Sequence, residues 1–110
     1  GVRPIGKVHF DCFMTPEFDL TIRELERKTL ILAGVEAHIC VAQTALHALP
    51  SFKTHIVADA IGARTIENRD IAIERMRQTG ATITSTEMVI YEILQRAGTD
   101  TFKAALQLVK

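Results

Sequence analysis

The largely apolar run Thr29–Val35 places the strongest constraint on how this chain can fold. Its length and its β-branched residues predict a strand. Apolar residues fill consecutive positions instead of alternating with polar ones, so we expect other elements to cover the strand on both faces, as in a parallel sheet. The mostly apolar segment 37–49 follows and predicts a helix, which Pro50 ends.

Strand-like and helix-like segments alternate along the chain. The predicted strands are 29–35, 53–58 and 81–84, and residues 59–63 form a predicted turn. The predicted helices are 19–27, which Asp19 caps, 37–49 and 66–79. A further helix is predicted from the Thr84–Glu87 capping box to Ala97, and a last one after Thr99. This alternation implies right-handed crossovers and a parallel sheet. We therefore predict a single α/β domain over residues 1–110, with a three-layer, doubly wound parallel sheet and helices on both faces.

The composition argues against several classes of protein. Lys plus Arg and Asp plus Glu are equal at 13 each, so there is no basic excess, and we expect no nucleic-acid partner. No apolar run approaches the roughly 20 residues of a membrane-spanning helix, and we expect no membrane partner. The two cysteines, Cys12 and Cys40, form no disulfide framework. This favours a reducing, cytoplasmic compartment, with mitochondria or another intracellular site as alternatives.

Cys40 lies where chemistry is expected. It follows the first predicted strand through Gly34 and falls in the first turn of the predicted helix 37–49. Ligands of open α/β sheets bind at the carboxyl ends of strands, and the free N–H groups and dipole of a helix N-terminus favour a thiolate. These features favour a nucleophilic cysteine. The alternative is a small apolar core residue, since cysteine is among the most buried residue types.

The sequence around Cys40 resembles a known family. The stretch Gly-Val-Glu-Ala-His-Ile-Cys-Val-Ala-Gln-Thr-Ala-Leu at residues 34–46, followed by His-Ile-Val-Ala-Asp-Ala at 55–60, is similar to the nucleophile region of the isochorismatase-like cysteine hydrolases. The resemblance continues in order through Arg64-Thr65, Arg75-Met76, Gly80-Ala81 and Ser85-Thr86-Glu87. It is closest to the isochorismatase-domain-containing subgroup, whose natural substrates are mostly unassigned, and it implies a Rossmann-like fold.

The resemblance implies that Cys40 and Lys7 belong to an Asp–Lys–Cys triad. Residues 6–13, Gly-Lys-Val-His-Phe-Asp-Cys-Phe, look like the family's Lys-x-x-Phe-Ser-x-Phe loop, with Asp11 in place of the usual serine. A lysine in such a site holds positive charge near both the thiolate and the oxyanion. The alternative for Lys7 is a solvated surface residue, because lysine is almost never buried without a partner.

The resemblance also implies an oxyanion hole in the turn before the cysteine. Its donors would be the backbone N–H groups of Cys40 and of Ala37 or Glu36, next to a cis peptide bond between Val35 and Glu36. The Glu36 side chain is interpreted as a structural contact, with a substrate contact as the alternative.

The aspartate of the triad is not identified within these residues. Members of the resembled family open with a strand that ends in the catalytic aspartate, and we expect this segment to lie outside the present sequence. Asp59, which follows the strand 53–58, is interpreted as structural. We expect Asp11 to form a salt bridge or a loop hydrogen bond. The pair His38 and Cys40 is too small for a zinc site, which needs three or four ligands, so we expect no metal and no cofactor.

Two functions remain open. The first is a cysteine hydrolase that acts on a small amide, imide or related C–N or ether substrate. The second is a catalytically silent scaffold or oligomerisation protein with the same fold. We expect a homo-oligomer, because the apolar character of the helix 37–49 exceeds what one face of a small domain can cover.

Overall fold

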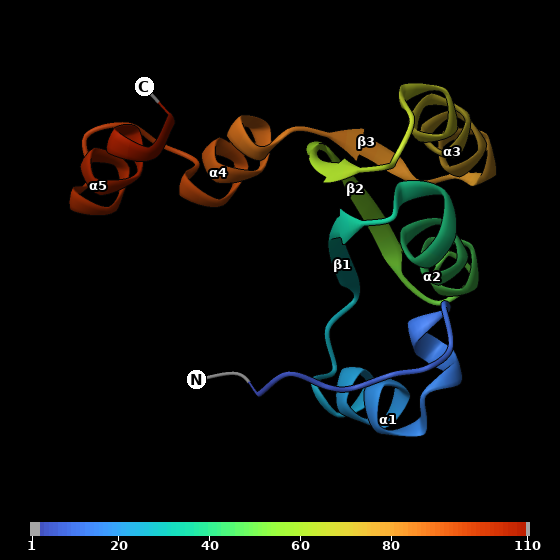
Figure 1. Ribbon diagram of the computed structural model, residues 1–110. Helices are drawn as coiled ribbons and strands as arrows, with labels where there is room; N and C mark the ends of the chain where they lie inside the picture. Colours follow the sequence, from blue (N-terminus) through green and yellow to red (C-terminus); the bar gives the residue numbers. More distant parts are fainter. Residues whose placement is uncertain (1–2, 110) are drawn as a thin grey trace.

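The computed structural model describes residues 3–109 and places helices on both sides of a small parallel sheet (Figure 1). In chain order, the elements are the 3-10 helix η1 (Cys12–Met14), α1 (Pro16–Glu24), β1 (Thr29–Val35), the π-helical turn η2 (Ala37–Val41), α2 (Ala42–Ala48), β2 (Lys53–Gly62), α3 (Ile66–Thr79), β3 (Thr82–Thr84), α4 (Thr86–Leu94) and α5 (Asp100–Val109). The strands run parallel in the order β1-β2-β3, which confirms the predicted α/β fold.

Strand β2 is longer than the sequence predicted. The first residues of β1 pair regularly with β2, from Thr29 opposite Lys53 to Leu32 opposite Ile56, and the register then shifts before Gly34 pairs with Ile61. The predicted turn 59–63 is therefore wrong, because β2 continues through an irregularity to its end. Exposed small and polar residues suit a bulge as well as a turn, and the sequence pattern does not separate the two.

The core lies between the sheet and the helices α2 and α3. Ile56 of β2 and Met76 of α3 are fully buried, and Ala37 and Ala45 beside them are also 0% exposed. Alanines let the backbone of α2 approach both the strand and the neighbouring helix, because their side chains occupy little space between the elements. This packing holds the start of η2, and with it Cys40, against the end of β1.

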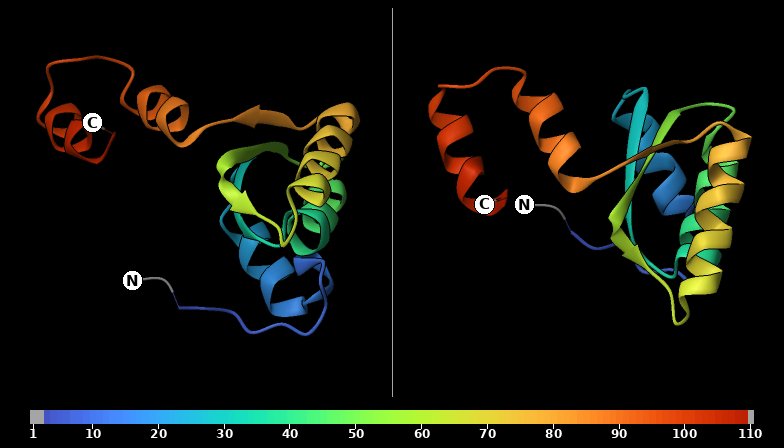
Figure 2. Two further views of the ribbon diagram at one scale, coloured as in Figure 1. Left: turned by 45° about the horizontal axis from the view of Figure 1, so that its top comes forward. Right: turned by 90° about the horizontal axis from the view of Figure 1, so that it is seen from above.

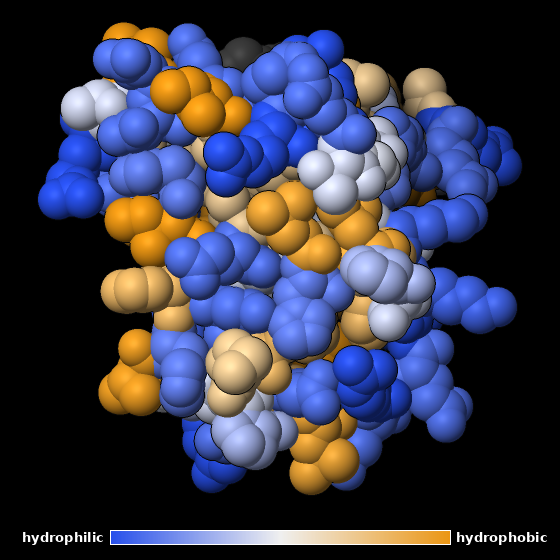
Figure 3. Space-filling view, turned by 90° about the vertical axis from the view of Figure 1, so that its right-hand side faces the viewer, coloured by the Kyte–Doolittle hydropathy of each residue, from blue (hydrophilic) through white to orange (hydrophobic). Residues whose placement is uncertain are grey.

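The helix 37–49 is buried within its own chain. Ala42, Thr44, Ala45 and Ala48 of α2 are all buried, and the surface over α2 and α3 is largely hydrophilic with scattered apolar side chains (Figure 3). The argument that this helix needs a second subunit to cover it is therefore wrong. Sheet and α3 together cover the apolar positions, which the sequence alone does not show.

Helix α4 lies on the opposite side of the sheet from α2 and α3 (Figure 2), where it contacts β2. Helix α5 packs on α4 through Tyr91 and Phe102, whose ring centroids are 6.0 Å apart. Between α4 and β1 a groove remains, and Ile31 of β1 is 50% exposed. The expectation that other elements bury β1 on both faces is thus wrong for the described residues, because β1 is an edge strand and α4 contacts its neighbour β2.

The ends of α3 agree with the sequence analysis, whereas the start of α4 does not. Thr65 caps α3 and Gly80, with φ of 119°, ends it. Ser85 caps α4 in place of the predicted Thr84, which is the buried last residue of β3.

Helix α1 and the end of α4 also differ from prediction. Helix α1 begins at Pro16, because proline is favoured in the first turn of a helix. The expected cap Asp19 instead binds Arg23 at 2.9 Å. Helix α4 ends before Gln95, whose φ is 63°, and so falls short of the predicted Ala97. In the part of the chain that the structure describes, no helix combines the length and the apolar character needed to cross a bilayer.

Candidate active site

A cavity of about 150 Å³ lies at the carboxyl end of β1. It is lined by Lys7, Cys12, Leu32, Ala33, Gly34, Val35, Cys40, Val41 and Thr44. Both residues that the resemblance implies for the triad are in this lining. So is Cys12, which the sequence analysis did not consider as a site residue, although it lies inside the loop 6–13 that carries Lys7.

Lys7 and Cys40 meet in this cavity although they are far apart in the sequence. The ammonium Nζ of Lys7 lies 3.5 Å from the Sγ of Cys40 and also donates to the carbonyl of His9 at 3.0 Å. At this separation a positive charge attracts negative charge that develops on the sulfur during a reaction. The second cysteine, Cys12, is also free, and both side chains are half-buried.

The turn before Cys40 has an unusual backbone. Gly34 has φ of 113°, a conformation that favours glycine because it has no Cβ, and the peptide bond between Val35 and Glu36 is cis, the geometry that the resemblance implied. The carbonyl of Glu36 then accepts from the N–H groups of Ile39 at 3.1 Å and Val41 at 3.2 Å. The first turn of the predicted helix is therefore π-helical, a form that is frequent at functional sites.

The side chain of Glu36 forms ionic contacts at the same turn. Its Oε2 lies 3.0 Å from Nε of Arg64 and 3.9 Å from Nε2 of His38. Arg64 follows β2, so this ion pair links the turn after β1 to the turn after β2. The contact agrees with a structural role for the Glu36 side chain, and Glu36 is absent from the lining of the cavity.

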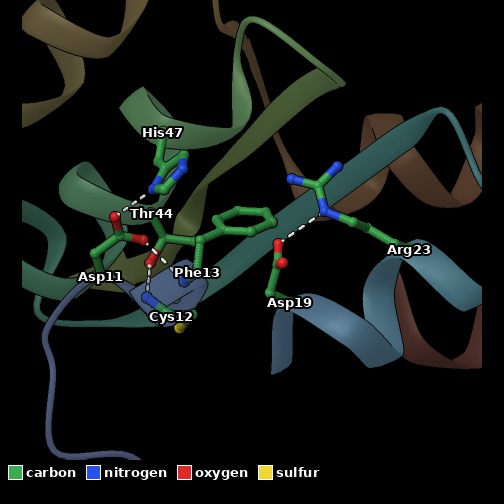
Figure 4. Close-up of polar contacts among 7 residues, drawn as sticks. All are labelled: Asp11, Cys12, Phe13, Asp19, Arg23, Thr44 and His47. Carbon is green, nitrogen blue, oxygen red and sulfur yellow. Dashed lines mark hydrogen bonds and ion pairs between the residues drawn. The ribbon is translucent and has the colours of Figure 1, made fainter. Parts of the chain in front are cut away.

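Asp11 and Asp59, the two carboxylates considered as a possible base, both have other partners. Asp11 binds His47 at 2.7 Å (Figure 4). Asp59 accepts at Oδ1 from the backbone N–H of Thr86 at 2.8 Å and from its hydroxyl at 2.9 Å. These bonds, the backbone one first, hold the pKa of Asp59 below its usual value. Neither residue lines the cavity, and no other carboxylate among residues 3–109 does so either.

The part of the chain that the structure describes contains no cluster of metal-ligating side chains. Over residues 3–109, no group of three or more His, Cys, Asp and Glu side chains is arranged to hold an ion. His38 and Cys40 lie in the same π-helical turn, but they have no third ligand of this kind.

Comparison with known sequences places these features in context. The model of the isochorismatase domain family matches residues 1–88. A secreted isochorismatase effector, Isc1, from Phytophthora sojae is 39% identical over 112 aligned residues, which cover 99% of this chain and 53% of that protein. The chain thus spans about half the length of this curated relative.

Solved structures share the fold. YcaC from Pseudomonas aeruginosa, described with covalent acrylamide, is 29% identical with a TM-score of 0.85, covering 91% of this chain and 51% of its own. YcaC from Escherichia coli, described as an octameric hydrolase of unknown specificity, is 32% identical with a TM-score of 0.67, covering 76% and 40%. MAR1 ribonuclease from Caenorhabditis elegans is 32% identical with a TM-score of 0.83, covering 94% and 53%.

Proposed function

Because the chain belongs to the isochorismatase domain family, we propose that the protein is a hydrolase of this family whose nucleophile is Cys40. The observation that supports this assignment best is the 3.5 Å contact between the Lys7 ammonium and the Cys40 sulfur. It lies in a cavity at the carboxyl end of a parallel strand, where α/β proteins bind ligands. The covalent acrylamide described for YcaC of P. aeruginosa supports a reactive nucleophile in this fold.

The proposed substrate is a small amide, imide or related C–N or ether compound. The cavity of about 150 Å³ accepts a small group, and Leu32, Val35 and Val41 give it apolar walls. The thiolate of Cys40 would attack the carbonyl carbon of an amide and form a tetrahedral intermediate. Loss of the amine would leave a thioester, and water would then hydrolyse the thioester to the acid and free the thiol.

Two groups would stabilise the negative charge that develops. The Lys7 ammonium stands next to the sulfur and offsets charge on the thiolate. The backbone N–H groups of Cys40 and of Ala37 or Glu36 are the proposed oxyanion donors, because the first N–H groups of a helix have no acceptor within the helix. Of these residues, Cys40 lines the cavity, and Glu36 and Ala37 belong to the turn that leads to it.

The proton acceptor in this proposal is an aspartate outside residues 1–110. Neither Asp11 nor Asp59 lines the cavity, and both have the partners described above. The amine that leaves needs a proton and the attacking water must lose one, and a single carboxyl group can serve both steps. The proposal therefore concerns the full-length protein, of which this chain contributes the thiol and the ammonium.

The test is hydrolysis by the full-length protein of a panel of primary amides, cyclic imides and vinyl ethers, with a short RNA as a separate arm. Release of ammonia or acid that is abolished by Cys40→Ala and retained by Cys12→Ala would support the proposal. RNA cleavage that survives Cys40→Ala would favour the activity described for MAR1 instead. A panel without turnover and without a covalent adduct on Cys40 would favour the catalytically silent scaffold.

We also propose that the protein forms a homo-oligomer in a cytoplasmic, reducing compartment. The octameric state described for YcaC of E. coli supports the first part. So does the exposure of Ile31 and Ile93, at 50% and 70%, because both line the groove between β1 and α4 and exposed apolar side chains at one groove favour association. The two free cysteines accord with a reducing compartment, whereas the relative from P. sojae is described as secreted.

A further inference from the structure

We propose that the contact between Asp11 and His47 holds the loop of residues 6–11 against α2, so that both are positioning residues for Lys7. We call this contact the Asp11–His47 latch. The proposal rests on the proposed function, in which the Lys7 ammonium acts on the Cys40 sulfur. Asp11 and His47 lie outside the Asp–Lys–Cys triad, and the proposed function gives neither of them a role.

The loop that carries Lys7 has no regular secondary structure and is largely exposed. Residues 6–10 form neither helix nor strand. Val8 is 92% exposed and Phe10 57%, so the loop buries little apolar surface against the rest of the chain. The Lys7 ammonium donates to the carbonyl of His9, two residues further on in the same loop, which orients the side chain but does not fix the loop to the domain. On the amino-terminal side of the loop, Arg3 lies 3.7 Å from Glu17 of α1, but both side chains are exposed, so we expect the stronger anchor on the other side of the loop.

The chain becomes anchored directly after this loop (Figure 4). Asp11 Oδ2 lies 2.7 Å from His47 Nδ1, and Asp11 Oδ1 accepts from the N–H of Phe13 at 2.9 Å. The N–H of Cys12 donates to the hydroxyl of Thr44 at 3.0 Å. The Phe13 ring is buried, with its centroid 5.1 Å from that of the His47 ring. One carboxylate thus caps η1 and binds α2 at the same time.

Helical spacing explains why this anchor can set the position of Lys7. Cys40, Thr44 and His47 are separated by four and three residues, which places them on one face of the helical segment formed by η2 and α2. Each of the three contacts the loop or η1: Cys40 meets Lys7, Thr44 meets Cys12, and His47 meets Asp11. The nucleophile and the anchor for its partner therefore sit on the same rigid element, and the latch fixes their separation.

The latch is open to solvent on one side, which limits its strength. The side chain of His47 is 46% exposed and that of Asp11 15%. Ion pairs in such positions contribute little to global stability. Loss of the latch should therefore leave the domain folded and change mainly the fraction of molecules in which Lys7 lies near the sulfur. A variant without the latch should therefore keep the stability of the wild type and differ from it in the reactivity of Cys40.

The experiment measures the rate at which iodoacetamide alkylates Cys40 in the full-length protein at pH 7, with Cys12 resolved separately by peptide mass spectrometry. His47→Ala should slow the reaction about two- to threefold, a share of the effect of removing the charge itself. Asp11→Ala, which also removes the cap of η1, should approach the effect of Lys7→Met. His47→Asn keeps an N–H donor near the position of Nδ1 and should restore most of the rate.

A double-mutant cycle separates positioning from general damage. If the latch acts through Lys7, His47→Ala should have no further effect in the Lys7→Met background. Arg23→Gln is the matched control, because it removes the exposed Asp19–Arg23 pair of α1 (Figure 4) and should leave the rate unchanged. Thermal denaturation of each variant checks that the fold is retained.

Each outcome supports or overturns a defined claim. If Lys7→Met does not slow alkylation, the proposed function and the latch fail together. If Lys7→Met slows alkylation and His47→Ala does not, the latch alone is overturned. An equal effect of His47→Ala with and without Lys7, or an equal loss in Arg23→Gln, also overturns the latch.

Discussion

Replacement of Lys7 by methionine tests the most specific feature of the site, the ammonium 3.5 Å from the Cys40 sulfur. The side chain of Lys7 is exposed, so water screens its charge. With an effective dielectric constant between about 80 and about 40, two unit charges at this distance interact by about 1 to 2.5 kcal/mol. If the sulfur carried a full negative charge in the transition state, that energy would correspond to about a five- to sixtyfold change in rate.

The expected change in rate is smaller than this upper limit. A Brønsted slope of about 0.5 means that the sulfur keeps about half of its charge in the transition state, so the rate follows roughly the square root of the full factor. Lys7→Met should therefore slow alkylation of Cys40 at pH 7 by about two- to eightfold. Methionine keeps the length of the side chain and removes the charge, so steric access to the sulfur should change little.

The assay is the pseudo-first-order rate of carbamidomethylation of Cys40 in the full-length protein, at low salt and again at about 1 M salt, where the screening length falls to about 3 Å. The difference between wild type and Lys7→Met should shrink at high salt. Lys28→Met is the matched control, because Lys28 is exposed and does not line the cavity. Equal rates for wild type and Lys7→Met, or equal losses for both variants, would refute the electrostatic argument.

Three further predictions concern the thiol, the fold and the assembly. Iodoacetamide at limiting concentration should label Cys40 before Cys12, read by mass spectrometry, and preferential labelling of Cys12 would contradict the assignment of the nucleophile. The pKa of Asp59 is lowered in the folded chain, so its contribution to stability is present above the ordinary value of about 4 and is lost as the pH falls through the lower folded value. Asp59→Asn should thus be less stable to urea than wild type near neutral pH, and the difference should shrink as the pH falls below the ordinary value of about 4; a difference that does not depend on pH would argue against the charge. Light scattering of the full-length protein should show a homo-oligomer, and a monomer at micromolar concentration would contradict that proposal.

Local sequence patterns account for most of the secondary structure. The apolar run Thr29–Val35 is a strand with the predicted bounds, and Thr65 and Gly80 delimit α3 as expected. These features depend on neighbouring residues: β-branched side chains favour a strand, a hydroxyl caps a helix, and glycine accepts a positive φ. The predicted turn after residue 58 failed where local composition suits two structures equally.

The resemblance to a family, rather than any periodicity, indicated the cis bond and the pairing of Lys7 with Cys40. Physical reasoning from the residues alone left Lys7 as a possible surface residue and Cys40 as a possible core residue. The structure brings their side chains together across a loop and a helical turn. A contact between residues so distant in the sequence depends on chain topology, which local propensities do not encode.

The tertiary structure alone decides which residue Asp11 binds and which elements cover the helix 37–49. The sequence placed Asp11 in a loop with either a salt bridge or a hydrogen bond, and its partner His47 follows from the approach of η1 to α2. The apolar character of residues 37–49 predicts that this helix is covered, and the sequence pattern attributes the cover to a second subunit, whereas the sheet and α3 cover it. An apolar sequence pattern shows that these residues leave water. It does not show which surface covers them, because the hydrophobic free energy is not directional, and the arrangement of the other elements decides this.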